Sequence, residues 1–407
     1  MDKQPSVFGG ACIIASVCVG AGMLALPSAG SGAWTVWSTA VIVMTMIMMT
    51  LSGWLLLESY KHYDLHASFN TVTRDVLGPQ VNVINNLAVY FVGGILLYAY
   101  TTSLGGTLEH LTGGALNSKL ASILACIVCG AFVWHSTRAV DRISELLIIT
   151  MVLTFAFSIF GLLGHIRFDT LFDTATAGQG DYAKYTMMLL PVGLTSFGYH
   201  HSVASMRAYY GEEKKASRAI LYGTIITVSI YLVWLIAIFG NLPRPAFAPI
   251  IAAGGDVNIL IDKLGDVVNA TSMKNIIAAF SLAAVVSSFI GVGLGVFDYL
   301  ADCFHFADNR AGRSKTWLVT FLPPLACSLI SPAGFVKAIG YAGAVATIWT
   351  CMVPAALAWK IRQRPDHKAG FTAPGGMVFV ALLFLYGILV ALFHFLNMLH
   401  KLPVYQG

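Results

Sequence analysis

The stretch that decides the fold is Cys12-Ile-Ile-Ala-Ser-Val-Cys-Val-Gly-Ala-Gly-Met-Leu-Ala-Leu-Pro27. It is apolar enough to enter a membrane, but Gly20 and Gly22 stand where a lipid-facing helix would carry Leu or Ile. A second segment, Pro191-Val-Gly-Leu-Thr-Ser-Phe-Gly-Tyr-His-His-Ser202, is interrupted in the same way. Unpaired backbone groups at membrane depth are tolerated only where they line a cavity. Both segments therefore predict membrane helices that are broken near their middles.

The composition places these segments in a membrane protein. Of the 407 residues, 57% are apolar and only 11% are charged, whereas a soluble domain carries roughly 25% charged residues. This balance excludes a soluble globular protein and a disordered chain. The net charge of +5 comes from 24 basic and 19 acidic residues, too few for a stripe that follows nucleic-acid phosphates.

Stretches without Asp, Glu, Lys or Arg locate the membrane spans, because a spanning helix needs about 20 mostly apolar residues. These stretches are 4–57, 76–108, 120–137, 146–166, 185–206, 219–243, 275–297, 316–336, 338–359 and 369–400. The first is long enough for two helices, and Ser28-Ala-Gly-Ser-Gly-Ala-Trp34 supplies turn chemistry in its middle. We therefore expect an all-α polytopic protein with about eleven transmembrane helices.

The basic residues between these spans predict the orientation, because loops rich in Lys and Arg stay in the cytoplasm. With a cytoplasmic N-terminus, 16 of the 24 basic residues fall in cytoplasmic loops. An odd number of spans then places the C-terminus outside. In a bacterial cell this topology corresponds to a multi-pass protein of the inner membrane with a periplasmic C-terminus.

The two broken spans are the first and the sixth, which are corresponding members of two five-helix halves. Since five is odd, the second half is inverted relative to the first, as in transporters whose discontinuous helices form the binding site. We expect a first repeat at 1–167, an inverted second repeat at 184–360, and an eleventh helix with the external C-terminus at 369–407. The alternative is that Gly and Pro only ease helix packing.

Exposed helix ends predict the chemistry of such a site. Free N–H groups at the start of a half-helix attract an anion, and free carbonyls at the end of the other half attract cations. The N–H groups of Ala21, Gly22 and Met23 are candidates for a carboxylate. Carbonyls around Ser16–Val19 and Thr195–Phe197 are candidates for an ammonium group or a coupling cation. A zwitterionic amino acid fits both.

Several motifs in one order resemble the bacterial hydroxy and aromatic amino acid permease family, and most closely its tryptophan permeases. They are Val19–Pro27, Ser31–Trp34, Ser68–Asp75, Leu97–Tyr100, Ser196–His200, Gly295–Asp302, Ile339–Gly343, Ala346–Trp349 and Leu402–Gln406. The resemblance covers nearly the whole chain. It implies a symporter that imports tryptophan or a related aromatic amino acid, with ten spans in a leucine-transporter-like 5+5 inverted repeat and one extra C-terminal helix.

Two departures from this family bear on the coupling ion. Relatives carry a lysine in the fifth span where this chain has Met151, so the position that a sodium ion fills elsewhere has no built-in cation. First-helix carbonyls with the hydroxyls of Ser287 and Ser288 would suit sodium, which prefers oxygen ligands. Family membership favours protons and Met151 favours sodium, so both stay open. The second departure is His201 directly after His200.

The histidines and the third span contribute further candidates. His200 or His201 could carry a coupling proton, or a neutral histidine could pair with the unwound backbone. The resemblance places Tyr98, Tyr100, Thr101 and Thr102 near the substrate pocket, where Tyr98 with Thr101 or Thr102 forms one helical face. Phe197 and Phe289 could stack on an indole ring, although core packing is the alternative role for any single Phe.

These arguments define two sets of site residues. The expected substrate-binding residues are Gly20, Ala21, Gly22, Met23, Tyr98, Thr102, Ser196, Phe197, Gly198, Tyr199, His200 and Phe289. The expected coupling-ion residues are Ser16, Val19, Ser287 and Ser288, with Met151 at the position of the missing lysine.

The partners and the competing function classes follow from the same residues. We expect no cofactor other than a bound sodium ion, no nucleic acid, and a bilayer environment in which a monomer would suffice. A passive facilitator or channel is the alternative to ion-coupled symport. An enzyme is disfavoured, because the spans contain no nucleophile and base pair and no metal-ligand cluster. Among substrates, the resemblance implies tryptophan first and tyrosine next.

Overall fold

The computed structural model describes residues 6–65, 67–174, 181–268, 271–332, 334–365 and 370–406, and in these ranges it is entirely helical, with no strand. The helices are α1 (Val7–Cys18), α2 (Ala21–Gly30), α3 (Trp34–Tyr60), α4 (Phe69–Leu77), α5 (Pro79–Leu111), α6 (Ser118–His135), α7 (Thr137–Leu163), α8 (Phe168–Leu171), η1 (Ala183–Tyr185), α9 (Thr186–Ser196), η2 (His200–Ser202), α10 (Val203–Tyr210), α11 (Glu213–Asn241), η3 (Arg244–Phe247), α12 (Ala248–Ala252), α13 (Val257–Val268), α14 (Thr271–Cys303), α15 (Arg310–Ile330), α16 (Phe335–Thr347), η4 (Ile348–Met352), α17 (Val353–Ile361) and α18 (Gly376–Met398). The predicted all-α polytopic class is confirmed.

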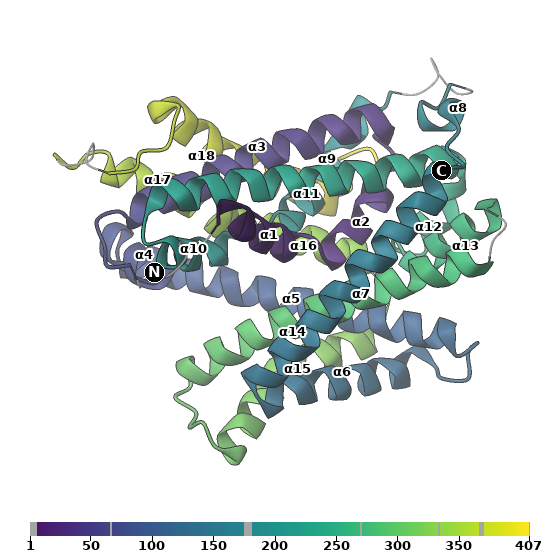
Figure 1. The fold of residues 1–407 in the computed structure, drawn as a ribbon, viewed down its shortest axis with the longest axis horizontal. Coiled ribbons are helices and arrows are strands. Elements are labelled where there is room, and N and C mark those ends of the chain that lie inside the picture. The colour runs from purple at the N-terminus through teal and green to yellow at the C-terminus, as the bar shows by residue number, and fades with distance from the viewer. Residues whose placement is uncertain are drawn as a thin grey trace.

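Eight helical segments of the described chain are long and apolar enough to cross a membrane, and α1 with α2 adds a ninth as a pair bent by 61°. The predicted sixth span is divided between α9 and α10, which have 11 and 8 residues. The predicted ninth span is α15, which carries Arg310, Arg313 and Lys315 near its start. Figure 1 shows α15 beside α6 at the lower edge of the bundle. The count of eleven spans stays a prediction.

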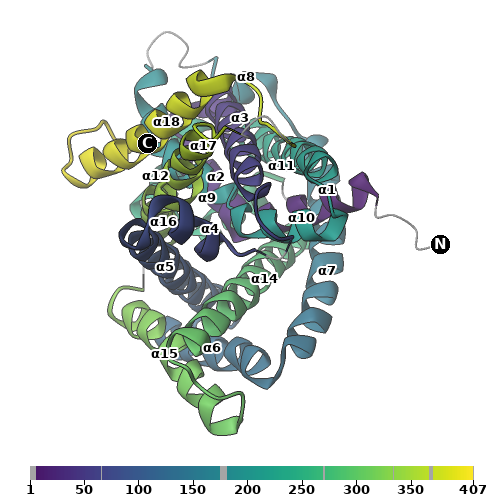
Figure 2. The same ribbon diagram turned by 90° about the vertical axis from the view of Figure 1, so that its left-hand side faces the viewer.

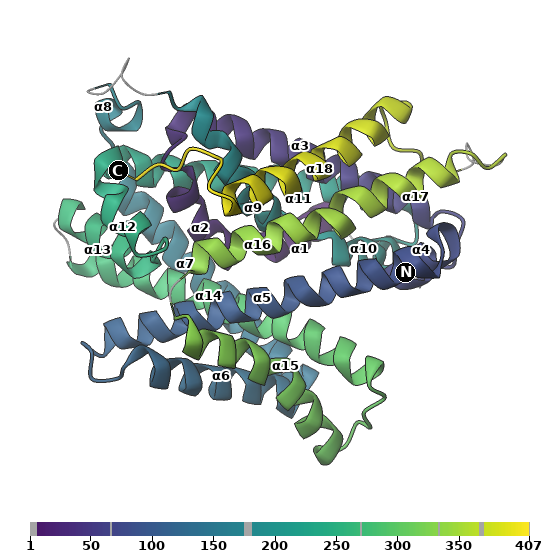
Figure 3. The ribbon, with the colours of Figure 1, turned by 180° about the vertical axis from the view of Figure 1, so that it is seen from behind.

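The loops separate into two ends of the bundle. The start of α1 lies with α4, α10 and the end of α17 at one end, and α8, α12, α13 and the C-terminus lie at the other (Figures 1 and 3). We call these the N-terminal end and the C-terminal end. Seen from the N-terminal end, α2 and α9 lie inside the bundle, with α3, α5, α11, α14 and α16 around them (Figure 2). This arrangement buries α2 and α9, which are the halves of the two broken spans toward the C-terminal end.

Polar side chains cap the helices where the chain turns. Ser6 Oγ accepts from Gly9 N at 3.0 Å at the start of α1, and Asn117 Oδ1 accepts from Leu120 N at 2.9 Å at the start of α6. Each cap satisfies one of the N–H groups that a helix start leaves unpaired. The two caps therefore mark the residues at which α1 and α6 begin.

A buried ion pair fixes the N-terminal end of the bundle. Glu58 on α3 is 0% exposed, and its two oxygens accept from Arg362 Nε at 3.0 Å and Nη2 at 2.7 Å. Ala373 N also donates to Glu58 Oε2 at 2.9 Å. A buried charge is tolerated when it is paired and fully hydrogen-bonded. The pair ties α3, the residue after α17 and the segment before α18 into one unit.

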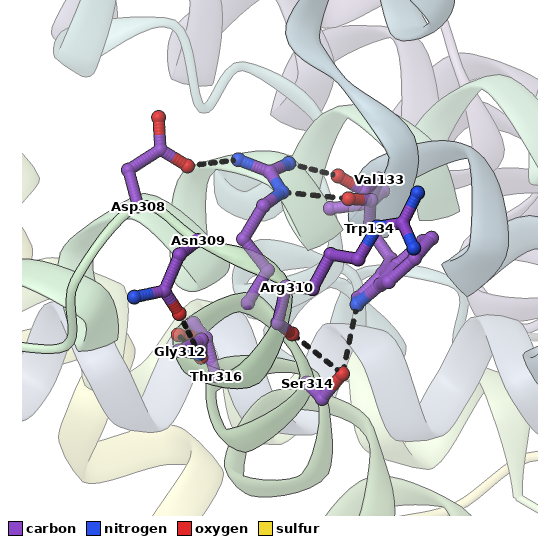
Figure 4. A network of polar contacts seen from close by, with 9 residues as sticks. Val133, Trp134, Asp308, Asn309, Arg310, Gly312, Ser314 and Thr316 are labelled. Carbon is purple, nitrogen blue, oxygen red and sulfur yellow. Dashed lines mark hydrogen bonds and ion pairs between the residues drawn. The ribbon is translucent and has the colours of Figure 1, made fainter.

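Arg313 joins α15 to α6, and Figure 4 labels its partners Val133, Trp134 and Asp308. Arg313 donates through Nε to Trp134 O at 2.6 Å and through Nη2 to Val133 O at 2.9 Å. These carbonyls lie in the last turn of α6, where a helix leaves its C=O groups unpaired and a cation is favourable. Asp308 pairs with the same guanidinium at 3.0 Å, and the guanidinium lies 5.1 Å from the ring centroid of Phe297 on α14.

We expect Arg313→Gln to destabilise the fold by about 1–3 kcal/mol, because two helix-end carbonyls lose their donors. The thermal midpoint of the purified protein in detergent should fall. Arg310→Gln is the matched control, since only the backbone oxygen of Arg310 takes part in the network, as the acceptor from Ser314 Oγ. An equal fall in both variants would show that Arg313 contributes only surface charge.

Candidate functional site

The first span breaks at Val19 and Gly20, between α1 and α2. A Cβ atom at Gly20 would lie 2.5 Å from Ser288 Oγ on α14. A Cβ atom at Gly22 would lie 3.1 Å from Ser196 Oγ and 3.3 Å from Ser196 Cα on α9. Both glycines are therefore needed for close approach. They bring the start of α2 against α14 and against the end of α9.

The start of α2 has three N–H groups that the sequence assigned to an anion. Ala21 N donates to Ser288 Oγ at 3.0 Å, and Met23 N donates to Gly20 O at 3.2 Å. Gly22 N has no hydrogen-bond partner among the described residues. Gly22 N is therefore the N–H group that remains available to an anion. Ser288, on α14, caps the start of α2 through its side chain.

The sixth span breaks between Ser196, the last residue of α9, and the 3-10 turn that begins at His200. Phe197 N and Gly198 N still bond to Leu194 O and Thr195 O, both at 3.1 Å, so the last turn of α9 tightens before it ends. Ser196 Oγ donates to Val192 O within α9 at 2.9 Å. The carbonyl of Ser196 is left facing the centre of the bundle.

Tyr231 on α11 connects the two breaks. Its hydroxyl contacts Cys18 O, at the end of α1, at 2.7 Å, and it also contacts Ser196 O, at the end of α9. Its ring lies edge-on to Phe197 at 5.2 Å, and Tyr231 is fully buried. The phenol therefore lies between two helix-end carbonyls. These are carbonyls for which the sequence predicts a bound ammonium group or coupling cation. Tyr231 is not among the residues predicted from the sequence, because it stands alone in an apolar run and looks like a packing residue.

Tyr100 on α5 belongs to the same cluster. Its hydroxyl hydrogen-bonds with Ser288, and its side chain lies near Tyr231. Tyr100 is buried. Together Tyr100, Tyr231 and Ser288 lie where α1, α2 and α9 meet.

Other candidates from the sequence point elsewhere. Tyr98 OH donates to Ser331 O at 2.9 Å, at the C-terminal end of the bundle, and Thr102 Oγ1 donates to Ala99 O in its own helix at 2.8 Å. Two residues along a helix rotate a side chain by about 200°, so Tyr98 and Tyr100 point to different sides of α5. The substrate-binding roles of Tyr98 and Thr102 stay predictions. Phe289 stacks on Phe321 of α15 at 5.5 Å, in the core.

Tyr199 and His200 anchor the second break to the opposite side of the bundle. Tyr199 OH donates to Met49 O on α3 at 2.8 Å. His200 Nε2 lies 2.9 Å from Ser52 Oγ, whose own hydroxyl donates to Thr350 O. Because Ser52 gives its proton to that carbonyl, it accepts from His200, so the neutral ring carries its proton on Nε2. His200 is therefore held by α3 and η4.

The carbonyl of Thr350 is available for a local reason. Pro354 has no N–H and excludes the usual bond to the carbonyl four residues earlier. The chain responds with the π-helical turn η4 at Ile348–Met352, a form that occurs mostly as a single turn within α-helices. Ser52 Oγ donates to the carbonyl of Thr350 in place of the missing N–H. Because Ser52 also contacts His200, these bonds link η4 to the broken sixth span.

The residues expected to hold a coupling ion have separate environments. Ser16 Oγ is exposed and donates to Ile13 O in its own helix at 2.8 Å, and Ser288 is occupied by Ala21 N. Met151 is buried on α7, which packs along α14. Val19 and Ser287 are half-buried. Among the described residues, the hydroxyl of Ser287 makes no hydrogen bond, in contrast to the hydroxyls of Ser16 and Ser288.

Exposure differs between the two ends of the broken spans. Nearly all of α2 and of the central part of α9 is buried. By contrast, Ser16 and Val17 on α1, His201 in η2 and Ser205 on α10 are exposed. On α14 the small residues Gly291 and Gly295 are exposed as well. The halves of the broken spans toward the C-terminal end are therefore buried, whereas the halves toward the N-terminal end carry exposed residues.

Arg244 joins the turn after α2 to the C-terminal tail at the C-terminal end of the bundle. It donates through Nη2 to Gly32 O at 2.7 Å and through Nε to Ser31 O at 3.2 Å. Its guanidinium lies 4.5 Å from the ring centroid of Tyr182 and 4.2 Å from that of Tyr405, in the C-terminal tail. Burial raises the pKa of Tyr405, so its ring stays neutral against the cation. We call this cluster the Arg244 gate.

The chain is similar to known amino acid transport proteins along nearly its whole length. A profile of the tryptophan/tyrosine permease family matches residues 3–394. A tryptophan-specific transport protein of Pseudomonas aeruginosa is 44% identical, covering 100% of this chain and 98% of the relative. One of Shigella flexneri is 42% identical with the same coverage. A tyrosine permease of Enterobacter agglomerans is 37% identical, covering 99% and 98%.

Among solved structures, a manganese transporter of Eremococcus coleocola is similar, with a TM-score of 0.62 and 13% identity, covering 97% of this chain and 86% of that one. This likeness confirms the predicted leucine-transporter-like fold. The likeness concerns the fold alone. The residues that the structure describes include no group of three His, Cys, Asp or Glu side chains that could hold a metal ion.

Proposed function

This chain belongs to the tryptophan/tyrosine permease family, and on that premise we propose that it imports an aromatic amino acid by cation-coupled symport, with tryptophan ahead of tyrosine. It is a multi-pass membrane transporter and not an enzyme. The observation that carries the proposal is the meeting of two broken helices at Gly22, Ser196 and Tyr231. The family resemblance and the names of the relatives support the substrate class.

The broken helices suit both ends of an amino acid. The substrate carboxylate accepts from Gly22 N, the unpaired donor at the positive end of α2. The ammonium group binds near Ser196 O and the oxygen of Tyr231, which retains lone pairs when its proton is donated. The indole ring packs against Phe197 and Tyr100, which are both buried, and aromatic pairs of this kind favour offset or edge-on contacts.

The coupling ion is sodium or a proton. Sodium would bind carbonyl and hydroxyl oxygens near Val19 and Ser287, beside the uncharged Met151. A proton would be carried by His201, which is exposed, since His200 is already bound to Ser52. The basic loops support a cytoplasmic N-terminal end. With that orientation the accessible face of α1 and α10 opens inward, and import requires the Arg244 gate to open.

Uptake into proteoliposomes tests coupling directly. Radiolabelled tryptophan is supplied outside under an inward sodium gradient at equal pH, under an inward proton gradient without sodium, or under neither, with protein-free liposomes as the control. Accumulation above the external concentration under one gradient supports symport with that ion. Simple equilibration at the same rate in all three arms would identify a passive facilitator and contradict the proposal.

We expect Met151→Lys to reduce sodium-driven uptake about tenfold or more if sodium couples transport, because a buried ammonium would repel the ion at close range. Met151→Leu is the matched control, since it keeps the volume without adding charge. The measurement is the initial rate of uptake against sodium concentration. Full sodium dependence in Met151→Lys would show that the ion binds away from α7.

A further inference from the structure

A cavity of about 240 Å³ lies at the C-terminal end of the bundle, lined by the last turns of α5 and the start of α13. Figure 3 shows α12 and α13 at this end. Residues from the start of α6 and from the segment before α16 complete its wall. The volume is below the roughly 300–1,000 Å³ that is typical of small-molecule sites. It suits an ion with several water molecules, each of which fills about 30 Å³ in the liquid.

Two carboxylates line this cavity, Glu109 on α5 and Asp256 just before α13, and the described residues of its wall include no Lys, Arg or His. Neither carboxylate forms an ion pair with another described residue. Asp256 Oδ1 accepts from Asn258 N at 2.7 Å and so caps the start of α13. A Cβ atom at Gly106 would lie 3.9 Å from Asp256 Oδ2, so this second oxygen lies toward α5. The cavity therefore carries uncompensated negative charge.

Ser103 adds an unpaired hydroxyl on the same face of α5. Ser103, Gly106 and Glu109 are spaced by three residues and all line the cavity, so they share one face of the helix. Ser103 is 9% exposed, and its Oγ has no hydrogen-bond partner among the described residues. This Oγ is not one of the fully enclosed unpaired atoms of the described chain, so it is accessible from the cavity. Because buried polar groups are almost always hydrogen-bonded, the hydroxyl indicates a bound ligand.

We propose that this cavity binds one hydrated divalent cation of the hard, oxygen-preferring class, Ca²⁺ or Mg²⁺. The carboxylates of Glu109 and Asp256 supply the charge, and Ser103 Oγ supplies a neutral oxygen. Mg²⁺ keeps several waters and binds through one or two carboxylates, and Ca²⁺ takes roughly 6–8 oxygen ligands that include water. No group of three His, Cys, Asp or Glu side chains lies together in the described chain, so water completes the coordination.

The bound cation bridges two elements that are far apart in the sequence. Glu109 and Ser103 lie on α5, whereas Asp256 lies between α12 and α13. The cation therefore holds the start of α13 against α5 and should raise the thermal midpoint of the protein, as a ligand that binds only the folded state does. The inference depends neither on the substrate nor on the ion that couples transport.

Equilibrium binding of radioactive calcium tests the site. The purified full chain in phosphatidylcholine nanodiscs is titrated with radioactive calcium chloride, with protein-free nanodiscs as the blank, and we expect one saturable site per chain. Glu109→Gln and Asp256→Asn should each weaken this binding about tenfold or more, because each removes a negative charge close to the cation. Asp256→Asn keeps an oxygen that can accept from Asn258 N, so α13 retains its cap. Displacement of the calcium by unlabelled magnesium chloride at lower concentration supports Mg²⁺, and failure to displace it supports Ca²⁺.

Asp266→Asn is the matched control, because Asp266 is exposed on the same helix and does not line the cavity. It should bind calcium as the wild type does, and calcium should raise its thermal midpoint, whereas Glu109→Gln should show no such rise. Equal elution profiles establish that the variants fold. Equal weakening in all three variants would reduce the effect to general surface charge and overturn the site. Absence of saturable binding to wild-type protein that still takes up tryptophan would also overturn it, while the proposed function stands.

Discussion

Tyr231→Phe is expected to weaken tryptophan binding by about 5- to 150-fold. The substitution keeps the ring but removes the hydroxyl that contacts Cys18 O and Ser196 O. Leaving a buried polar group unpaired costs about 1–3 kcal/mol, which corresponds to that range of affinities. The substitution should weaken substrate binding, because both carbonyls lie at the ends of the half-helices that hold the substrate. Equilibrium binding of radiolabelled tryptophan and initial uptake rates measure the effect.

Tyr222→Phe on the same helix is the matched control, because Tyr222 is exposed. If the freed carbonyls instead recruit a cation, uptake by Tyr231→Phe should gain dependence on the coupling ion, and its affinity should recover as that ion is raised. Wild-type affinity and rate in Tyr231→Phe, at every ion concentration, would show that the phenol has no part in the site.

The breaks and the spans could be predicted from the sequence because each depends on local chemistry. The turn expected within Ser28–Trp34 occurs at residues 31–33, between α2 and α3. The breaks expected at Gly20 and near Gly198 occur where small residues permit close approach or tight turns. Charge-free stretches locate spans because burial of a charge in lipid is costly wherever it occurs. These features need no knowledge of which helices are neighbours.

The direction of individual side chains could not be predicted, because it depends on contacts between distant helices. Tyr98 and Tyr100 are equivalent by composition, and only the packing of α5 turns Tyr100 toward Ser288. Tyr231 could not be distinguished from a packing residue until Cys18 and Ser196 were brought to it. The role of Ser52 depends on a carbonyl freed by a proline about 300 positions further along the chain.

Gly22→Leu is expected to weaken tryptophan binding by about 100-fold or more while the protein still folds. The added Cβ atom would lie 3.1 Å from Ser196 Oγ and 3.3 Å from Ser196 Cα, so the end of α9 must move away from α2. Overpacking of this kind costs about 1–3 kcal/mol. A shift of about 1 Å at a site can cost roughly 100-fold in function, and the bulky side chain also crowds the free N–H of residue 22.

A graded series separates the close approach from general damage. Gly22→Ala should lose less than about tenfold, because a single methyl group at these distances needs Ser196 to move by only a few tenths of an ångström. Gly164→Leu is the control, since a Cβ atom there meets nothing within 4 Å. Equal elution profiles for all variants would establish folding. Wild-type affinity in Gly22→Leu would remove the junction of α2 and α9 from the site, and with it the geometric basis of the proposed transport.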